Sequence, residues 1–506
     1  MMQYYRRNCY NNSYSFFKIL TIQLATNMTV SRPETYKYDQ VSRYISELIE
    51  KGELKPGDKV PSLRKLSKQL GVSIATVTQS YVNLEDQGVL TAKPQSEFYV
   101  NNLDDQINDI AKSTTTGRQA RRVRFGELFE EVFRNANDPR ITPFGTSNPS
   151  MDFMPVKSLT RATRSIVSRY PQKSMDYLFP PGDRKLREQI AQQYAHTHTR
   201  ISADDVIITS GATEALSISL RTVAKRGDII AVESPTYFAV LRMIEQMGML
   251  AVEIETDPVT GLNLEALEEA FDTMDIKAVM ASPNTNNPLG CQMPEENKRA
   301  LVNLLAERNI PLIEDDVYGS VYFGDKPPRP AKSYDLNNIV LSCSSFSKTL
   351  APGHRVGWVI AGRYYKKFLQ YKQAWSSATS SINQLALAEF LSSGQYDRHL
   401  VRLRLAMREQ VERGRFMIAK NFPEGTCVSH PHGGNVLWVE MPQGCDSIDI
   451  FNRALEHNIA ITPGILFSAT RGFRNHLRIN CGSPWNEANE NALKTLGQIV
   501  CKCRSG

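Results

Sequence analysis

The segment SSFSKTLAPGHRVGW, residues 344–358, places two basic side chains, Lys348 and Arg355, close together on a backbone rich in small residues. One apolar run, NIVLSCSS (338–345), leads into the segment, and a second, VGWVIA (356–361), leaves it. A single lysine is most often a solvated surface residue. Because this one lies in a Gly- and Pro-containing loop between two runs typical of buried strands, its role depends on the other strands of the same sheet.

Apolar runs of the same kind recur from about residue 140 onward and alternate with segments of helical period. Besides the two above, they are DVIITS (205–210), DIIAVES (228–234), KAVMAS (277–282) and IPLIEDD (310–316). Buried strands separated by helices predict a largely parallel sheet with both faces covered. Ligands of such sheets bind beyond the carboxyl ends of the strands.

Polar residues follow several of these strands. The segments are SGATEAL (210–216), SPTY (234–237), NNPLG (286–290) and EDDVY (314–318). The first begins a helix, so the amides of Gly211, Ala212 and Thr213 would face an anion. Taken singly, each segment has an ordinary structural explanation, such as a core aromatic residue, a turn or a helix cap.

The order of these segments resembles that of the fold-type I aminotransferases, which hold pyridoxal 5′-phosphate (PLP). The similarity extends from about Gly145 to Gly482. Seven motifs follow in the family's order: YLFPPGDRKLR (177–187), SGATEAL, SPTY, NNPLG, DDVY (315–318), SSFSKTLAPGHRVGW and LRINCG (477–482). The resemblance implies a large α/β PLP-dependent transferase domain with a mostly parallel central sheet and a smaller C-terminal α+β part.

The resemblance assigns roles to the opening segment. Lys348 is similar to the catalytic lysine that forms an internal aldimine with the cofactor, and this requires a neutral amine and hence a lowered pKa. Arg355, with Ser345 and Thr213, is expected to hold the cofactor phosphate through charge-assisted hydrogen bonds. The first amides of the helix that begins after Gly211 are expected to bind the same phosphate.

Further cofactor-binding residues are implied in the same way. Asp315 is expected to pair with the pyridine nitrogen and to keep it protonated. Asp316 is the alternative, and the D-x-x-Y spacing to Tyr318 favours Asp315. Tyr318 and Asn287 are expected to hydrogen-bond the phenolic oxygen of the cofactor, and Tyr237 to stack on its ring.

Two residues concern the substrate and the assembly. Arg478 resembles the arginine that binds the α-carboxylate of an amino acid. Tyr177 resembles the tyrosine that reaches the phosphate of the neighbouring subunit, which implies a homodimer. Leu289 departs from the family, which commonly has NPTG where this chain has NPLG. No side chain for the far end of the substrate is identified, so the amino acid or amine effector stays unnamed.

The N-terminal hundred residues follow another pattern. Helical periodicity is found in 37–51, 62–70 and 73–87, and hairpin-like alternation in 88–100. Ser62 and Ser73 are the expected N-caps of the second and third helices. The stretch GELKPGDKVPSLRKLSKQLGVSIATVTQSYVNLEDQGVL (52–90) resembles the GntR-type winged helix-turn-helix, a small α+β domain that binds double-stranded DNA.

The resemblance predicts DNA contacts. Groove contacts are expected from Ser73, Thr76, Thr78 and Gln79, and phosphate contacts from Arg64 and Lys65. Basic residues of the domain are Lys51, Lys55, Lys59, Arg64, Lys65, Lys68 and Lys93. Two departures bear on sequence preference: Ile74 stands where relatives commonly have arginine, and PQSEF (94–98) lacks the wing glycine. The alternative is a helical domain with a structural or dimerisation role.

Both resemblances together are the arrangement of the MocR-type bacterial regulators and span about residues 37–500. The expected divisions are a disordered extension (1–30, with Met28 as a candidate translation start), the winged helix (31–100), a linker (101–135) and the PLP-binding domain (136–506). The predicted function is a transcriptional regulator that senses PLP or an amino compound through an aldimine. Alternatives are an active PLP-dependent aminotransferase acting on an amino acid, for which residual transamination is chemically feasible, and a simple PLP store.

Composition agrees with a globular protein. The chain has 506 residues, 41% hydrophobic and 22% charged, with a net charge of +7 and a pI near 8.8. This mild basicity permits a polyanionic partner but does not require one. With no run of 18 apolar residues, no membrane partner is expected. The eight dispersed cysteines are expected to be reduced in the cytoplasm, and no metal site is expected.

Overall fold

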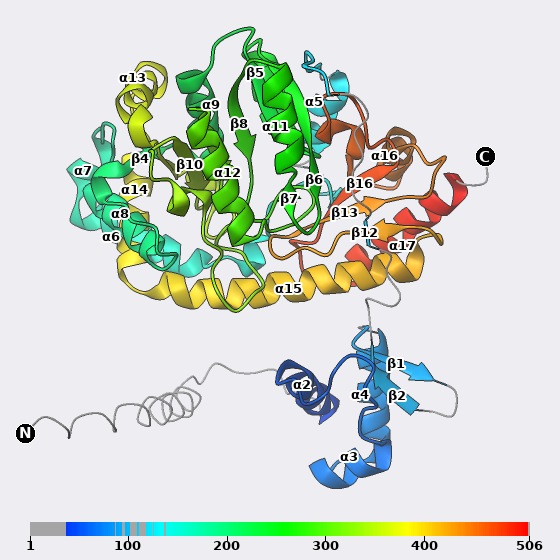
Figure 1. Ribbon diagram of the computed structural model, residues 1–506. Helices are drawn as coiled ribbons and strands as arrows, with labels where there is room; N and C mark the ends of the chain where they lie inside the picture. Colours follow the sequence, from blue (N-terminus) through cyan, green and yellow to red (C-terminus); the bar gives the residue numbers. More distant parts are fainter. Residues whose placement is uncertain are drawn as a thin grey trace, which may run out of the picture. The chain divides into compact units, whose positions relative to one another are not determined.

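The computed structural model describes residues 37–86, 88–93, 97–101, 109–110, 118–124, 126–135 and 138–503. The chain forms two compact units, Met1–Leu103 and Asp104–Gly506. The extension expected to be disordered (1–30), and Pro94 within the expected hairpin (88–100), lie outside the described residues. Each unit is described separately below (Figure 1).

The N-terminal unit is a three-helix domain with a hairpin. Its elements are α2 (Lys37–Glu50), α3 (Leu63–Leu70), α4 (Ile74–Asp86), β1 (Leu90–Lys93) and β2 (Glu97–Val100). The two strands pair antiparallel. The predicted caps are confirmed: Ser62 accepts a hydrogen bond from the Lys65 amide, Ser73 accepts one from the Thr76 amide at 3.1 Å, and Gly71 is left-handed with φ 64°. Its core contains Val41, Ile45, Leu66, Val77, Tyr81 and Leu84.

An eight-stranded sheet forms the centre of the second unit (Figure 1). Its strands, in spatial order, are β4 (Val206–Thr209), β11 (Gly357–Ile360), β10 (Val340–Ser345), β9 (Leu312–Asp315), β8 (Ile276–Ala281), β5 (Ile229–Ser234), β6 (Leu250–Asp257) and β7 (Gly261–Leu262). The five strands from β10 to β6 are parallel, whereas β11 runs antiparallel to both of its neighbours. The prediction of a mostly parallel sheet is confirmed.

Helices cover both faces of this sheet. They are α6 (Val156–Arg169), α7 (Pro171–Met175), α8 (Arg184–Ala195), α9 (Ala212–Val223), α10 (Phe238–Gln246), α11 (Leu264–Thr273), α12 (Glu295–Glu307), α13 (Tyr365–Ser376) and α14 (Ser381–Ser392). Successive strand residues point to opposite faces. In β5, for example, Ile230 and Val232 pack with α9 and α10, whereas Ala231 packs with α11 and α12.

The C-terminal part is a smaller α+β layer. Its antiparallel sheet contains β12 (Cys427–Val428), β13 (Val436–Glu440), β16 (His476–Asn480) and β15 (Thr462–Pro463), with α15 (Gln395–Asn421), α16 (Ser447–Glu456) and α17 (Glu487–Cys503). The long helix α15, yellow in Figure 1, packs at its start in the core beside β4 and β11 and later against α17. A short parallel pair, β3 (Thr142–Pro143) with β14 (Ile459–Ala460), ties the start of the domain to this part.

Part of the segment expected to be a linker packs on the large unit. The Arg121 amide donates to Ala251 O at 2.9 Å, and Val123 is buried in the core beside β6. Helix α5 (Glu127–Asn135) then places Phe129 and Phe133 edge-on against Phe238. The ordered large unit therefore includes residues that precede position 136.

Candidate functional site

Lys348 lies in the turn that follows β10, at the carboxyl end of the sheet. Its Nζ donates to Ser147 O at 2.8 Å, to Asn148 Oδ1 at 2.8 Å and to Ser147 Oγ at 3.3 Å. Removal from solvent lowers the pKa of Lys348 to about 7, assisted by the positive charges of Arg478 and Arg355 and opposed by Asp315. A substantial fraction of this amine is therefore neutral and nucleophilic near neutral pH.

Asp315 and Asp316 follow one another at the end of β9 but have different surroundings. Burial raises the pKa of Asp315 to about 6, and the charge of Lys348 acts on it in the opposite direction. Asp316 instead accepts a hydrogen bond from Asn284 Nδ2 at 3.0 Å, and burial with the nearby Glu314 raises its pKa well above the ordinary value. The structure thus places Asp315 on the side of Lys348.

Three further predicted residues lie around Lys348 and Asp315. The Tyr318 ring is 5.6 Å from Lys348 Nζ, and its hydroxyl donates to Ser147 O at 2.9 Å. Tyr237 directly precedes α10, and burial raises the pKa of its hydroxyl. Asn287 is buried and accepts a hydrogen bond from Arg478 Nη1 at 3.4 Å.

Arg478, on β16, is a buried guanidinium with 1% exposure. Its Nη2 donates to Gly145 O at 2.7 Å and to Thr462 Oγ1 at 3.1 Å, and its Nε has no hydrogen-bond partner among the described residues. No described carboxylate forms an ion pair with it, and burial lowers its pKa to about 10. Because a buried unpaired cation is costly, this geometry fits an anionic ligand group.

The turn from β4 into α9 forms the other end of the site. Gly211 has φ 88° and begins the helix without a side-chain cap, so the first amides of α9 stay available. Arg355 donates from Nη2 to Ser210 O at 3.0 Å, and its guanidinium occupies the space that a Cβ on Gly211 would take. Thr213, in the first turn of α9, is exposed, whereas Ser345, at the end of β10, is buried. Helix amides beside a guanidinium are suited to a phosphate.

Two residues at the site were missed by sequence reasoning. Ser147 and Asn148 supply all three acceptors of Lys348 Nζ, although they lie 200 positions earlier in the chain. They are held by Asn480, whose Nδ2 donates to Asn148 O at 3.2 Å. Their segment carries no recognisable motif, so only the folded sheet reveals the contact.

A buried ion pair behind α9 was also missed. Lys372 is fully buried and donates to Glu214 Oε2 at 2.8 Å, and Glu214 Oε2 accepts a hydrogen bond from the Ser210 amide at 2.6 Å. The ion pair stabilises the turn between β4 and α9, where Arg355 contacts Ser210 O. A signal was present in the sequence, because Lys372 follows the buried Phe368 by four residues on α13 and therefore shares its inward face.

Tyr177 lies away from Lys348's contacts, on an exposed tip. It is 68% exposed and stacks on Phe179, which is 64% exposed, at a ring distance of 5.4 Å. The adjacent Met175 is also exposed. Large aromatic residues left uncovered in this way are typical of a protein interface.

In the N-terminal unit, the predicted DNA-contacting residues lie on α3 and at the start of α4. Arg64 and Lys65 are exposed. Ser73 Oγ lies 2.8 Å from Thr76 Oγ1, Thr78 Oγ1 donates to Ile74 O at 2.9 Å, and Gln79 Nε2 donates to Asn83 Oδ1 at 2.9 Å. Lys51 and Lys59 pair with Glu47 and Glu97. The side chain of Lys93 lies outside the described residues.

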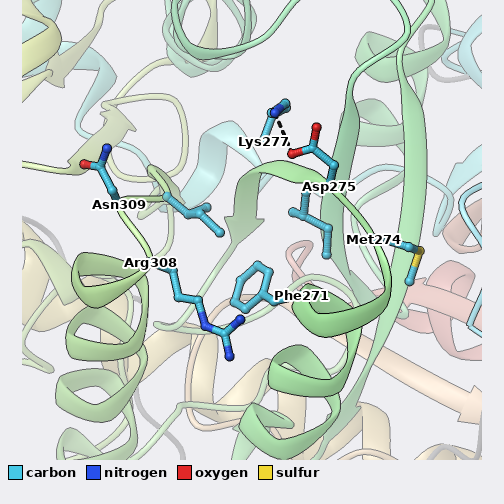
Figure 2. A pocket seen from close by; sticks show the side chains of 8 residues that line it. Phe271, Met274, Asp275, Lys277, Arg308 and Asn309 are labelled. Atoms are coloured by element: carbon cyan, nitrogen blue, oxygen red, sulfur yellow. Dashed lines mark hydrogen bonds and ion pairs between the residues drawn. The ribbon is translucent and has the colours of Figure 1, made fainter.

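A separate pocket of about 320 Å³ lies at the amino-terminal ends of β8 and β9, whereas Lys348 lies at the carboxyl end of the sheet (Figure 2). Phe271, Arg308 and the Lys277–Asp275 ion pair line it. Arg308 is itself paired with Asp272 at 2.9 Å. The pocket contains none of the predicted site residues, and its charged groups are already paired.

Comparison with known proteins agrees with both halves of the chain. Residues 140–496 match the family Aminotransferase class I and II, and residues 37–100 match Bacterial regulatory proteins, gntR family. Over 464 residues the chain is 38% identical to the HTH-type transcriptional regulator YjiR of Escherichia coli, covering 92% of this chain and 98% of YjiR. The chain belongs to the HTH-type transcriptional regulators with an aminotransferase-like domain. These are the MocR-type regulators.

A second regulator and a solved aminotransferase structure support the assignment of the chain to the MocR-type regulators. YdcR of Escherichia coli, also an HTH-type transcriptional regulator, is 36% identical over 464 residues, covering 92% of this chain and 99% of YdcR. The crystal structure of the α-aminoadipate aminotransferase LysN from Thermus thermophilus, complexed with N-(5′-phosphopyridoxyl)-L-leucine, superposes with a TM-score of 0.70 at 25% identity, covering 76% of this chain and 96% of LysN. The fold-type I architecture is therefore confirmed.

Within the described residues, no helix combines the length and apolar character needed to cross a bilayer.

Proposed function

We propose that this regulator binds double-stranded DNA through its N-terminal domain, holds PLP at Lys348 and responds to an amino acid or amine. The proposed divisions are the winged helix (31–100), a linker (101–135) and the PLP-binding domain (136–506). The last part of the linker, from Arg121 through α5, packs on the large unit. The proposal rests on one combination: a chain with a winged helix also has Lys348, whose pKa is lowered to about 7, and a buried Arg478 that pairs with no described carboxylate.

The residues of the site fit the cofactor. Lys348 would hold its aldehyde end, Asp315 its ring nitrogen, and Arg355 with the start of α9 its phosphate. When bound, the cofactor supplies an aldehyde that reacts reversibly with amines and a ring that withdraws electrons. Tyr237 would cover the ring. The remaining predicted contacts come from Tyr318, Asn287, Ser345, Gly211, Ala212 and Thr213.

The contacts of Lys348 suggest how an amino compound would be sensed. Its Nζ holds Ser147 and Asn148 by three hydrogen bonds. An amine that takes the place of Nζ, with its carboxylate on Arg478, would change these bonds and the bond from Arg478 to Gly145 O. Residues 145–148 follow α5 in the chain, so the changed segment lies on the covalent path towards the DNA-binding domain.

The test uses the full-length protein and a labelled duplex from its own upstream region. We expect DNA binding whose affinity falls steeply with salt, because phosphate contacts release counterions. A panel of amino acids and amines should contain at least one that changes this affinity in the wild type. Lys348→Ala should bind the duplex and give no response. Amino compounds without effect on DNA binding in a PLP-loaded protein would contradict the proposal.

A second candidate function is aminotransferase catalysis, favoured by the complete set of Lys348, Asp315, Tyr318, Arg355 and Arg478. The winged helix would then be vestigial or autoregulatory. Steady-state transamination across a panel of amino donors distinguishes the two functions. Turnover with kcat on the order of 1–1000 per second, typical of enzymes, together with no specific DNA binding would favour the enzyme.

The assembly is proposed to be a homodimer acting in the cytoplasm. The exposed Tyr177–Phe179 tip supports this, because an uncovered aromatic pair fits an interface with a second copy. Sedimentation velocity should show a dimer for the wild type and a larger monomer fraction for Tyr177→Ala with Phe179→Ala. A monomeric wild type at micromolar concentration would exclude the dimer.

A further inference from the structure

Ile74, the first residue of α4, is an exposed apolar side chain on the face expected to meet DNA. It is 48% exposed, whereas Val77, Tyr81 and Leu84 on the same helix are buried at 0–1%. Among the described residues of the N-terminal unit, the large apolar side chains left exposed are Ile74 and, two turns later, Val82. The Ile74 side chain is therefore not part of the core of this domain.

The hydroxyl groups around Ile74 are already used inside the helix. Ser73 Oγ bonds to the Thr76 amide at 3.1 Å and lies 2.8 Å from Thr76 Oγ1. Thr78 Oγ1 donates to the carbonyl of Ile74 at 2.9 Å. The neighbouring Ala75 is exposed and adds a methyl group. The first turn of α4 consequently presents more apolar surface than free hydrogen-bonding groups.

Basic side chains stand on the preceding helix. Arg64, Lys65 and Lys68 of α3 are exposed, and none forms an ion pair with a residue that the structure describes. An unpaired cationic helix joined to α4 by the tight turn at Gly71 favours a polyanion as the occupant of this face over an apolar protein surface. In a helix-turn-helix, the first residues of the second helix contact base edges in the major groove.

The major groove offers one apolar group to such a side chain, the C5-methyl of thymine. We infer that Ile74 is a specificity-determining residue that contacts a thymine C5-methyl group, once in each half-site. The inference rests on the proposed DNA-binding function and adds the base that the protein prefers. The same contact explains how a base can still be recognised at this position although isoleucine, unlike arginine, forms no side-chain hydrogen bonds.

The experiment first selects bound duplexes from a random-sequence pool with the full-length protein. Each thymine of the selected duplex is then replaced by uracil, which lacks only the methyl group. We expect one position per half-site at which the replacement weakens binding about fourfold, as expected for loss of one buried methyl contact. At that position 5-methylcytosine should bind more tightly than cytosine.

Ile74→Ala should bind more weakly and lose the uracil effect at that position. Val82→Ala is the matched control, since it removes the other exposed apolar side chain of α4, farther along the helix, and should keep the uracil effect. Circular dichroism checks that both variants fold. A selected duplex with no uracil-sensitive position, or one whose sensitivity survives Ile74→Ala, overturns the inference. If no duplex is selected at all, the proposed DNA-binding function itself fails.

Discussion

The reactivity of Lys348 follows from the charges that surround it. Its amine is removed from solvent, and the cations Arg478 and Arg355 add to the cost of protonation. Asp315 offsets part of that cost. Since the pKa is lowered from 10.5 to about 7, the amine is mostly protonated below pH 7 and mostly neutral above it.

This balance predicts the pH dependence of cofactor capture. The rate at which apoprotein takes up PLP, followed by absorbance, should rise with pH and reach half its maximum near pH 7, because the neutral amine is the nucleophile. Arg478→Gln removes a positive charge and should move the midpoint to higher pH. A midpoint near 10 in the wild type would show that Lys348 has an ordinary pKa.

The neighbouring aspartates allow a matched comparison. Asp315→Asn should weaken PLP binding about 10- to 100-fold, through loss of a charge-assisted hydrogen bond worth about 1.5–3 kcal/mol. Asp316→Asn should leave the affinity nearly unchanged, because Asp316 faces Asn284 and Glu314 rather than Lys348. Equilibrium titration of both apoproteins gives the comparison. Equal losses of PLP affinity in the two variants would contradict the assignment of Asp315, rather than Asp316, to the cofactor.

Most residues of the site could be predicted from the sequence because their motifs follow the order of those in the fold-type I aminotransferases. Lys348, Asp315 and Arg478 were found in this way, and the structure gathers them around one another. Ser147 and Asn148 could not be found, since their contact with Lys348 depends on how β16 holds their segment.

At the scale of elements, the turn between β4 and α9 sets the phosphate end of the site. Gly211 combines a left-handed φ of 88° with close approach of Arg355, so no other residue fits without displacing that guanidinium. Gly357 is similarly close, since a Cβ there would lie 2.6 Å from the carbonyl carbon of Gly211. The absence of a Cβ at Gly211 and Gly357 thus allows Arg355 and the first residues of α9 to lie in contact.

Gly211→Ala is therefore expected to weaken PLP binding at least tenfold while leaving the weaker binding of pyridoxal, which has no phosphate, unchanged. Gly353→Ala, in the segment between β10 and β11 that carries Arg355, is the control, because a Cβ there meets no atom within 4 Å. Titration of apoprotein with both ligands provides the measurement. A similar loss for pyridoxal would place the effect of Gly211 on the whole site rather than on the phosphate.

The elements themselves were largely predictable. The six apolar runs all contain strands of the central sheet, because both of its faces are buried and each run has at least three apolar residues. The packing of 118–124 and α5 on the large unit was not anticipated. Polar and basic residues dominate that stretch, and its anchors are a backbone pairing at Arg121 and the phenylalanines of α5.

The whole molecule combines two protein families in one chain. The regulatory relatives cover over nine-tenths of it, and the aminotransferase structure covers the second unit. The sequence could predict this combination because each half carries its own ordered motifs. It could not name the effector, since no motif marks the far end of the substrate site.

The most direct test of the central claim is borohydride reduction of the PLP-loaded full-length protein, followed by peptide mass mapping. The account predicts a pyridoxyl group on the peptide that contains Lys348 and none on that peptide in Lys348→Ala. A wild-type protein without the tag, or with the tag on a different lysine, would contradict it.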